Sequence, residues 1–144
     1  MPTEAHYRKL ENMYMSLPVN LQYEPQITIS QAKAEITIPV SEQYFHAADA
    51  VHGMVYFKLM DDTAFMAANS LLDDVFVLTT NFQLYFLRPV SSGQMRAVGK
   101  VVSQSKNQII SESIVFDSQG REISRGSGTF VRSRVTLTPE MGYK

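Results

Sequence analysis

One segment, residues 53–71, limits what this chain can fold into, because its pattern is that of a long helix with hardly any polar face. Its large apolar side chains are Val55, Tyr56, Phe57, Leu59, Met60, Phe65 and Met66. A helix that is apolar on nearly every side must be surrounded by the rest of the protein. Two acids, Asp61 and Asp62, nevertheless stand in its middle, and a His-Gly pair opens it.

The flanking segments predict strands that can surround this helix. Residues 26–40 form two alternating apolar and polar runs around Gln31 and Ala32, which is typical of a hairpin. After the helix, four β-like stretches follow, and the turns "SSG" and "SQGR" separate two of their pairs. We therefore expect an α+β fold in which one curved antiparallel sheet wraps around the long helix.

The N-terminal segment predicts a separate amphipathic helix over about residues 3–17. Thr3 is a candidate N-cap, and Pro18 is expected to end the helix. With 144 residues and no evident linker or repeat, the chain is expected to form one domain over residues 1–144.

Composition excludes several classes of function. The net charge is −1, which gives no electrostatic basis for binding nucleic acid or an anionic membrane surface. The absence of cysteine excludes disulfides, thiolate nucleophiles and cysteine metal sites, and it fits a cytoplasmic protein. Lys58, Asp61 and Asp62 argue against a membrane span over residues 53–72, and the N-terminus lacks the apolar core of a signal peptide. We expect no cofactor and no metal ion.

The two acids differ in their surroundings on the helix. Successive helical residues point ~100° apart, so Asp61 and Asp62 cannot share a face. Asp62 is one turn from Lys58, a plausible ion-pair partner, whereas Asp61 aligns with Phe57 and two alanines. Desolvation would raise the basicity of Asp61, which suits a general base or nucleophile. The alternative is a structural carboxylate that accepts hydrogen bonds from a loop or a neighbouring subunit.

The stretch "VHGMVYFKLMDDTAF", together with "LYFLRPVSSG" and "DSQGREISRGSGTF", resembles the hotdog-fold acyl-CoA thioesterases of the phenylacetate-degradation type. The resemblance extends from about Ile27 to Arg132. It implies the hotdog fold and hydrolysis of an acyl-CoA substrate. It also implies a homodimer, or a homotetramer, with sites between subunits: Gly53 would come from one chain and Asp61 from the other.

The resemblance assigns roles to three positions. The Gly53 amide would polarise the thioester carbonyl, since N–H groups in the first turn of a helix lack intrahelical partners. Asp61 occupies the position of the family's acid, and Thr79 would help to position a water molecule. The ordinary alternatives are a glycine required by a tight loop-to-helix junction and a threonine that is simply common in strands.

Two positions depart from the family pattern. His46 stands where the family usually has asparagine, six residues before His52. An imidazole can donate one hydrogen bond, and unlike asparagine it titrates near neutral pH; an exposed loop histidine is the alternative. Met54 replaces a frequent glycine and would shape the site for an apolar acyl group. We expect His52 to be buried and to brace the loop rather than to perform chemistry.

Further candidates would bind the substrate. Arg88 and Lys106 are the basic residues chosen for the coenzyme A phosphates, although such side chains are often merely solvated. Four aromatic residues would line an acyl pocket or belong to the core: Phe57, Phe82, Tyr85 and Phe86. Two other functions stay open: a hotdog hydratase or dehydratase that uses His46 and Asp61, and an acyl-CoA-binding protein without catalysis.

Overall fold

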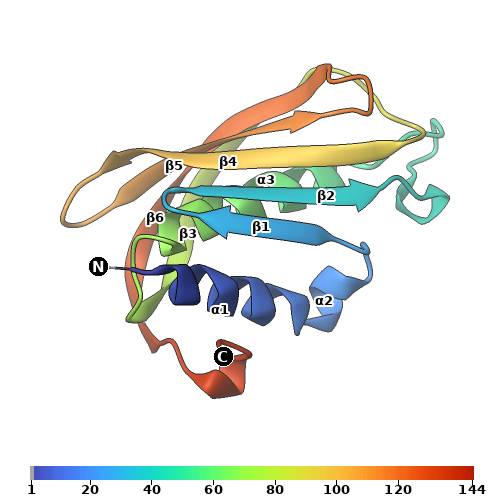
Figure 1. The fold of residues 1–144 in the computed structure, drawn as a ribbon. Coiled ribbons are helices and arrows are strands. Elements are labelled where there is room, and N and C mark those ends of the chain that lie inside the picture. Colours follow the sequence, from blue (N-terminus) through green and yellow to red (C-terminus); the bar gives the residue numbers. More distant parts are fainter. Residues whose placement is uncertain (1) are drawn as a thin grey trace.

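The computed structural model describes residues 2–144, and it consists of one curved sheet, a long helix inside the curve and a shorter helix beside it (Figure 1). The helices are α1 (Glu4–Met15), α2 (Pro18–Leu21) and α3 (Gly53–Asn69), with short 3₁₀ turns at Glu42–Tyr44 and Pro139–Met141. The strands are β1 (Gln26–Ser30), β2 (Lys33–Pro39), β3 (Val75–Phe86), β4 (Gln94–Gln104), β5 (Ile109–Phe116) and β6 (Glu122–Thr136).

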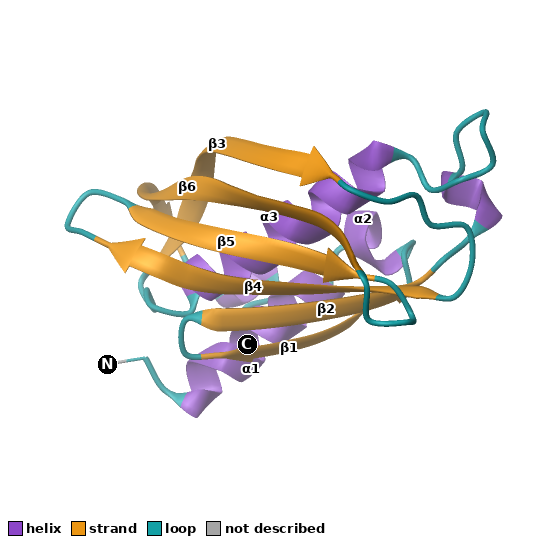
Figure 2. Ribbon diagram, turned by 90° about the horizontal axis from the view of Figure 1, so that it is seen from above, coloured by secondary structure: helices purple, strands orange, loops and turns teal. Residues whose placement is uncertain are grey.

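All neighbouring strands are antiparallel, in the order β1-β2-β4-β5-β6-β3. Figure 2 shows the sheet lying over α3, with β1 along one margin and β3 along the other. The hairpin around Gln31 and Ala32 and the four later strands are present as predicted, and Ala32 adopts a left-handed φ of 60° in the turn. The predicted α+β fold is confirmed.

Small residues allow α3 to lie close against the sheet. A Cβ added at Gly99 on β4 would lie 2.4 Å from the backbone of Thr63, so only glycine fits there. On β5, Ser113 Oγ donates to the carbonyl of Met60 at 2.7 Å and thereby links sheet and helix. Within residues 2–144, no helix combines the length and apolar character needed to cross a membrane.

The N-terminal region differs from its prediction in two respects. The first helix ends at Met15, and Pro18 does not terminate it but begins α2. Proline suits the first turn of a helix, because its missing N–H has no intrahelical partner to lose there. Thr3 is the N-cap residue, but its side chain makes no capping hydrogen bond, and only its carbonyl accepts from His6 and Tyr7.

One margin of the sheet is occupied by α1, which lies alongside β1 (Figure 1). Glu11 accepts a hydrogen bond from the Ile29 N–H at 2.7 Å, and Arg8 donates to the Ile29 carbonyl at 2.6 Å. Both outward backbone groups of this β1 residue are therefore satisfied by side chains of α1, as at protected edges of other sheets.

The other margin, β3, pairs only with β6 within the described chain. Its register shifts between Thr79 and Asn81, so a β-bulge interrupts the strand. Its side chains Leu78, Tyr85 and Phe86 are 47%, 71% and 59% exposed. An open strand edge with exposed apolar side chains is suited to pairing with another strand.

Candidate active site

Asp61 and Thr79 are brought together at the side of α3 that faces β3. Thr79 Oγ1 donates a hydrogen bond to Asp61 Oδ1 at 2.9 Å. Burial raises the pKa of Asp61, and the adjacent Asp62 adds to this rise, while the Thr79 hydrogen bond and Lys58 oppose it. A half-buried carboxylate with a raised pKa is suited to accept a proton or to attack a carbonyl carbon.

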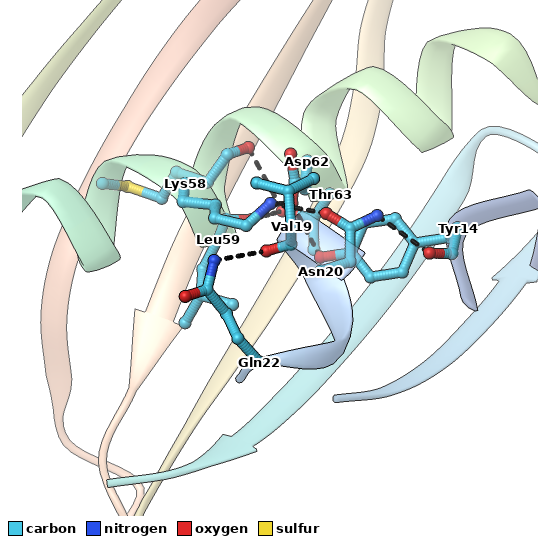
Figure 3. Close-up of polar contacts among 9 residues, drawn as sticks. Tyr14, Val19, Asn20, Gln22, Lys58, Leu59, Asp62 and Thr63 are labelled. Atoms are coloured by element: carbon cyan, nitrogen blue, oxygen red, sulfur yellow. Dashed lines mark hydrogen bonds and ion pairs between the residues drawn. The ribbon is translucent and has the colours of Figure 1, made fainter. Parts of the chain in front are cut away.

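Asp62 has different partners, as its helical face predicts. Its Oδ2 accepts from Lys58 Nζ and from the Tyr14 hydroxyl, both at 2.7 Å. Lys58 Nζ also donates to Asn20 Oδ1 at 2.7 Å (Figure 3). Burial, followed by the neighbouring Asp62 carboxylate, raises the pKa of Tyr14, so its hydroxyl stays a donor. The predicted Lys58–Asp62 ion pair is present. The Asp62 carboxylate is thus hydrogen-bonded to two side chains of the protein.

A groove of about 480 Å³ opens beside Asp61. Asp61 and Thr79 lie in its wall together with apolar side chains from the α1–α2 region, from α3 and from β3. The volume falls within the range of small-molecule sites, ~300–1,000 Å³. The structure therefore places the candidate base in a cavity that is large enough for a substrate.

Gly53 begins α3 beside a second cavity, of about 400 Å³. The Gly53 N–H takes part in none of the hydrogen bonds found within residues 2–144, so it is free for a ligand. The ring of Phe86 covers the glycine, and a Cβ at position 53 would lie 2.9 Å from Phe86 Cζ. His46 and Arg88 also line this cavity. An unpaired amide at the positive end of a helix is suited to bind a carbonyl oxygen.

The two loop histidines are exposed and differ in role. His52 is the N-cap of α3, and its Nδ1 accepts a hydrogen bond from the Met54 N–H at 3.0 Å. The expected bracing role is thus visible, but the expectation that His52 is buried is wrong, because a cap of this kind leaves the ring on the surface. His46 Nδ1 accepts from the Ala48 N–H at 3.0 Å. Neutral His46 therefore carries its proton on Nε2, where it can be donated.

The remaining candidates are distributed over the chain. Met54 and Phe57 are exposed on α3, and the rings of Phe57 and Phe82 meet edge to face at 5.5 Å between centroids. Arg88 lies at the end of the sheet where α3 begins, whereas Lys106 lies in the β4–β5 turn at the other end, in a different cavity. Lys106 thus joins neither Gly53 nor Asp61 within one chain.

Gly53 and Asp61 themselves lie apart on α3. Eight residues at ~1.5 Å each separate them by ~12 Å along the helix axis. They line different cavities, and one thioester carbonyl cannot reach both. Residues 2–144 contain no group of three or more His, Asp or Glu side chains arranged to hold a metal ion.

Two participants were not predicted from the sequence: Tyr14 and Asn20, which reach α3 from the N-terminal region. The sequence indicates Phe86 only as a pocket or core residue, and in the structure its ring covers Gly53. The apolar and polar pattern of residues 3–21 indicates a helix face that packs, but not which side chain meets Lys58 or Asp62. For Phe86, alternation along β3 indicates the inner side of the sheet, but the bulge near Thr79 shifts that alternation.

A six-stranded antiparallel sheet wrapped around one long helix is the hotdog fold, the fold of the thioesterases that this chain resembles. The family model of the thioesterase superfamily matches residues 49–124, and the chain belongs to this superfamily.

Several relatives and solved structures are similar to the chain. A protein from Saccharolobus solfataricus, whose name proposes an esterase, is 23% identical over 127 residues, covering 88% of this chain and 87% of that protein. The E. coli PaaI protein, from the phenylacetic acid degradation operon, has a TM-score of 0.86 at 20% identity, covering 96% of this chain and 100% of that chain. A thioesterase family protein from Silicibacter pomeroyi has a TM-score of 0.80 at 20% identity, covering 88% and 96%.

Proposed function

We propose that the protein is an acyl-CoA thioesterase in which Asp61 is the general base or nucleophile and the Gly53 amide is the oxyanion donor. Superfamily membership and the esterase name of the relatives support thioester hydrolysis as the class of activity. The observation that carries the proposal is the environment of Asp61: a half-buried carboxylate, bound by Thr79 and open to a groove.

The chemistry follows from these two groups. As a base, Asp61 takes a proton from water while the water oxygen attacks the thioester carbonyl carbon. The carbonyl oxygen gains negative charge, which the Gly53 N–H stabilises. The tetrahedral intermediate then expels the coenzyme A thiolate, which accepts a proton, and the carboxylic acid is released. As a nucleophile, Asp61 instead attacks the carbonyl carbon, the C–S bond breaks, and the coenzyme A thiolate leaves and accepts a proton. The resulting anhydride between Asp61 and the acyl group is then hydrolysed by water, which releases the carboxylic acid and restores Asp61.

The site combines two chains in this proposal. Because Gly53 and Asp61 of one helix are ~12 Å apart, the Gly53 amide that serves a given Asp61 comes from a second copy. The open β3 edge offers the place where a two-fold related copy pairs and continues the sheet. A dimer is the smallest assembly with this site, and a tetramer would contain two such dimers.

The β3 side chains favour one register for this pairing. Phe82, Leu84 and Phe86 face α3, as Thr79 does before the bulge. In an antiparallel pair, opposite residues share a face. A two-fold axis at Gln83 sets Phe82 opposite the partner's Leu84 and, across the bulge, Thr79 opposite the partner's Phe86. Since Phe86 covers Gly53, this register brings Asp61 towards the partner's Gly53.

The substrate is an acyl- or aryl-CoA in this proposal. Arg88, in the Gly53 cavity, is placed to meet coenzyme A phosphates, while Lys106 could do so only from the partner subunit. The origin of the similar PaaI protein in a phenylacetic acid degradation operon makes phenylacetyl-CoA one useful test substrate. The decisive assay measures free thiol released from a panel that runs from acetyl- to decanoyl-CoA and includes benzoyl- and phenylacetyl-CoA.

The two-chain arrangement has a separate test. Inactive Asp61→Asn subunits are mixed with inactive Gly53→Pro subunits, since proline removes the amide donor. A hybrid dimer then contains one site with both defects and one intact site, so about half the activity of a wild-type dimer returns. Folded hybrids that recover no activity would exclude a site shared between chains.

A hydratase is the second candidate, because His46 Nε2 is free in the Gly53 cavity and would face the partner's Asp61 in the same assembly. Hydration of an enoyl-CoA consumes the double bond without releasing thiol. Loss of absorbance of crotonyl-CoA without thiol release would favour this reaction over hydrolysis.

A further inference from the structure

The groove beside Asp61 has a wall that the N-terminal segment supplies. Leu17 and Val19, from the α1–α2 junction and α2, face residues of α3 and β3 across it. The other apolar lining residues come from α1, α3, β3 and the C-terminal turn: Met13, Phe65, Met66, Phe76, Leu78 and Met141. The cavity next to the candidate base is thus mainly apolar, and its exposed lining consists of Leu17 and Val19 on one side and Leu78 of β3 on the other.

Two of the three charged residues that line the groove, Lys58 and Asp62, are paired with each other. Lys58 Nζ bridges Asp62 and Asn20, each at 2.7 Å, and the Tyr14 hydroxyl completes the environment of Asp62. The Lys58 ammonium also lies 5.6 Å from the centroid of the Tyr14 ring. Because these groups satisfy one another, they offer no free charge to a ligand. Asp61 is left as the acid that faces the groove with only Thr79 as partner among the described residues.

The same network fixes the position of the wall. Asn20 is 4% exposed, its amide donates to the Tyr14 carbonyl at 2.8 Å, and its Oδ1 accepts from Lys58. Figure 3 shows Asn20 of α2 bonded to Lys58 of α3, while the carbonyl of the preceding residue, Val19, accepts from Gln22. Buried hydrogen bonds of this kind restrict motion, since breaking them leaves polar groups unpaired. The network therefore holds Leu17 and Val19 in place over the groove.

We propose that this groove receives the acyl part of the substrate, and that Leu17 and Val19 determine which acyl groups fit. The inference rests on the proposed thioesterase function and adds its substrate class: uncharged, apolar acyl or aryl groups. A carboxylate at the end of the acyl chain would lie near Asp61 in a cavity with no unpaired cation, which disfavours dicarboxylic acyl groups. Tyr14, Asn20 and Lys58 act through the wall and are positioning residues.

The test is to fill the groove from its exposed wall. Val19 is 56% exposed, so Val19→Trp adds volume at the groove without replacing a core side chain. We expect kcat/KM for phenylacetyl- and decanoyl-CoA to fall ~10-fold or more relative to acetyl-CoA, as when a specificity pocket is obstructed. Leu17→Trp, at the other exposed groove residue of the N-terminal segment, is a second variant with the same expected result.

Leu21→Trp is the matched control. Leu21 belongs to the same short helix and is 43% exposed, but it does not line the groove. Its ratio of long-chain to acetyl activity should equal that of the wild type. A uniform change across the panel in both wall variants, or no change, would overturn the inference while leaving the thioesterase proposal intact. A wild-type protein that releases thiol from no substrate overturns the thioesterase proposal itself, and this inference with it.

Discussion

Substituting each of the two neighbouring acids of α3 should have a different effect. Asp61→Asn should lower thioesterase activity without lowering stability, and Asp62→Asn should lower stability with little effect on activity. Asp61→Asn keeps the shape of the side chain, and the Thr79 hydroxyl can donate to the amide oxygen as it does to the carboxylate. The change removes the proton acceptor from the groove. Asp62 cannot replace Asp61 as the proton acceptor, because its carboxylate already accepts hydrogen bonds from Lys58 and Tyr14.

The expected loss of activity is large. Positioned general bases contribute ~10²–10⁴-fold, so kcat/KM should fall at least ~10²-fold. At ~1.36 kcal/mol per tenfold, this corresponds to ~2.7 kcal/mol or more of lost transition-state stabilisation.

The stability of Asp61→Asn should not fall. Burial raises the pKa of Asp61. A raised pKa means that its stabilising contribution is complete below the pKa of the unfolded chain and is lost as the pH rises through the folded-state value. At neutral pH, ionised Asp61 therefore costs stability, and asparagine removes that cost. The free energy of unfolding should be unchanged or slightly higher.

Asp62→Asn should show the opposite pattern. It leaves the half-buried Lys58 ammonium without its carboxylate, which costs about 1–2 kcal/mol after allowance for solvent screening of two partly exposed side chains. For a chain of this size, ~1 kcal/mol lowers Tm by ~3 °C. Thiol release should stay within a few-fold of wild type. Thermal unfolding and thiol release, measured on both variants, test the pair together. If Asp62→Asn abolished activity and Asp61→Asn did not, the assignment of the two helical faces would be refuted.

Three further predictions concern other positions. His46→Asn restores the residue usual in the resembled family and should retain substantial thiol release; a folded but inactive variant would point to imidazole chemistry and to the hydratase. Thr79→Val removes a hydrogen bond that lowers the pKa of Asp61, so the acid limb of the pH–rate profile should move to higher pH, and a downward shift would contradict this. Gln83→Cys, the sole cysteine of its chain, should form a disulfide-linked dimer on oxidation, whereas the exposed Val102→Cys on β4 should not; equal crosslinking of both would reject the register centred on Gln83.

The main elements were predictable because their signals are local. Residues 53–69 are apolar on nearly every side of a helix, which predicted α3. The β-like pattern of residues 94–116 predicted β4 and β5. Both signals come from neighbouring positions along the chain. The separation of Asp61 from Asp62 also follows from helix geometry alone, and the Lys58 ion pair agrees with it.

The predictions that failed or were missing depend on contacts between distant segments. The Thr3 side chain is a plausible cap by residue type but makes no capping hydrogen bond. The contact of Tyr14 with Asp62 spans 48 positions, and no sequence period reports it. The exposure of His52 follows from its bond to the Met54 amide, which a pattern of residue types does not reveal.

The contact of α1 with β1 limits how many chains can join. A sheet with two unprotected margins can add copies at both, and such growth has no natural end. Here Arg8 and Glu11 occupy the backbone of Ile29 at one margin, so pairing through strands is left to β3. In the proposed dimer, a second copy that docks there would use the open margin of both molecules at once. The N-terminal helix would then act as a terminator, because it leaves a closed pair, rather than a fibre, as the end point of strand addition.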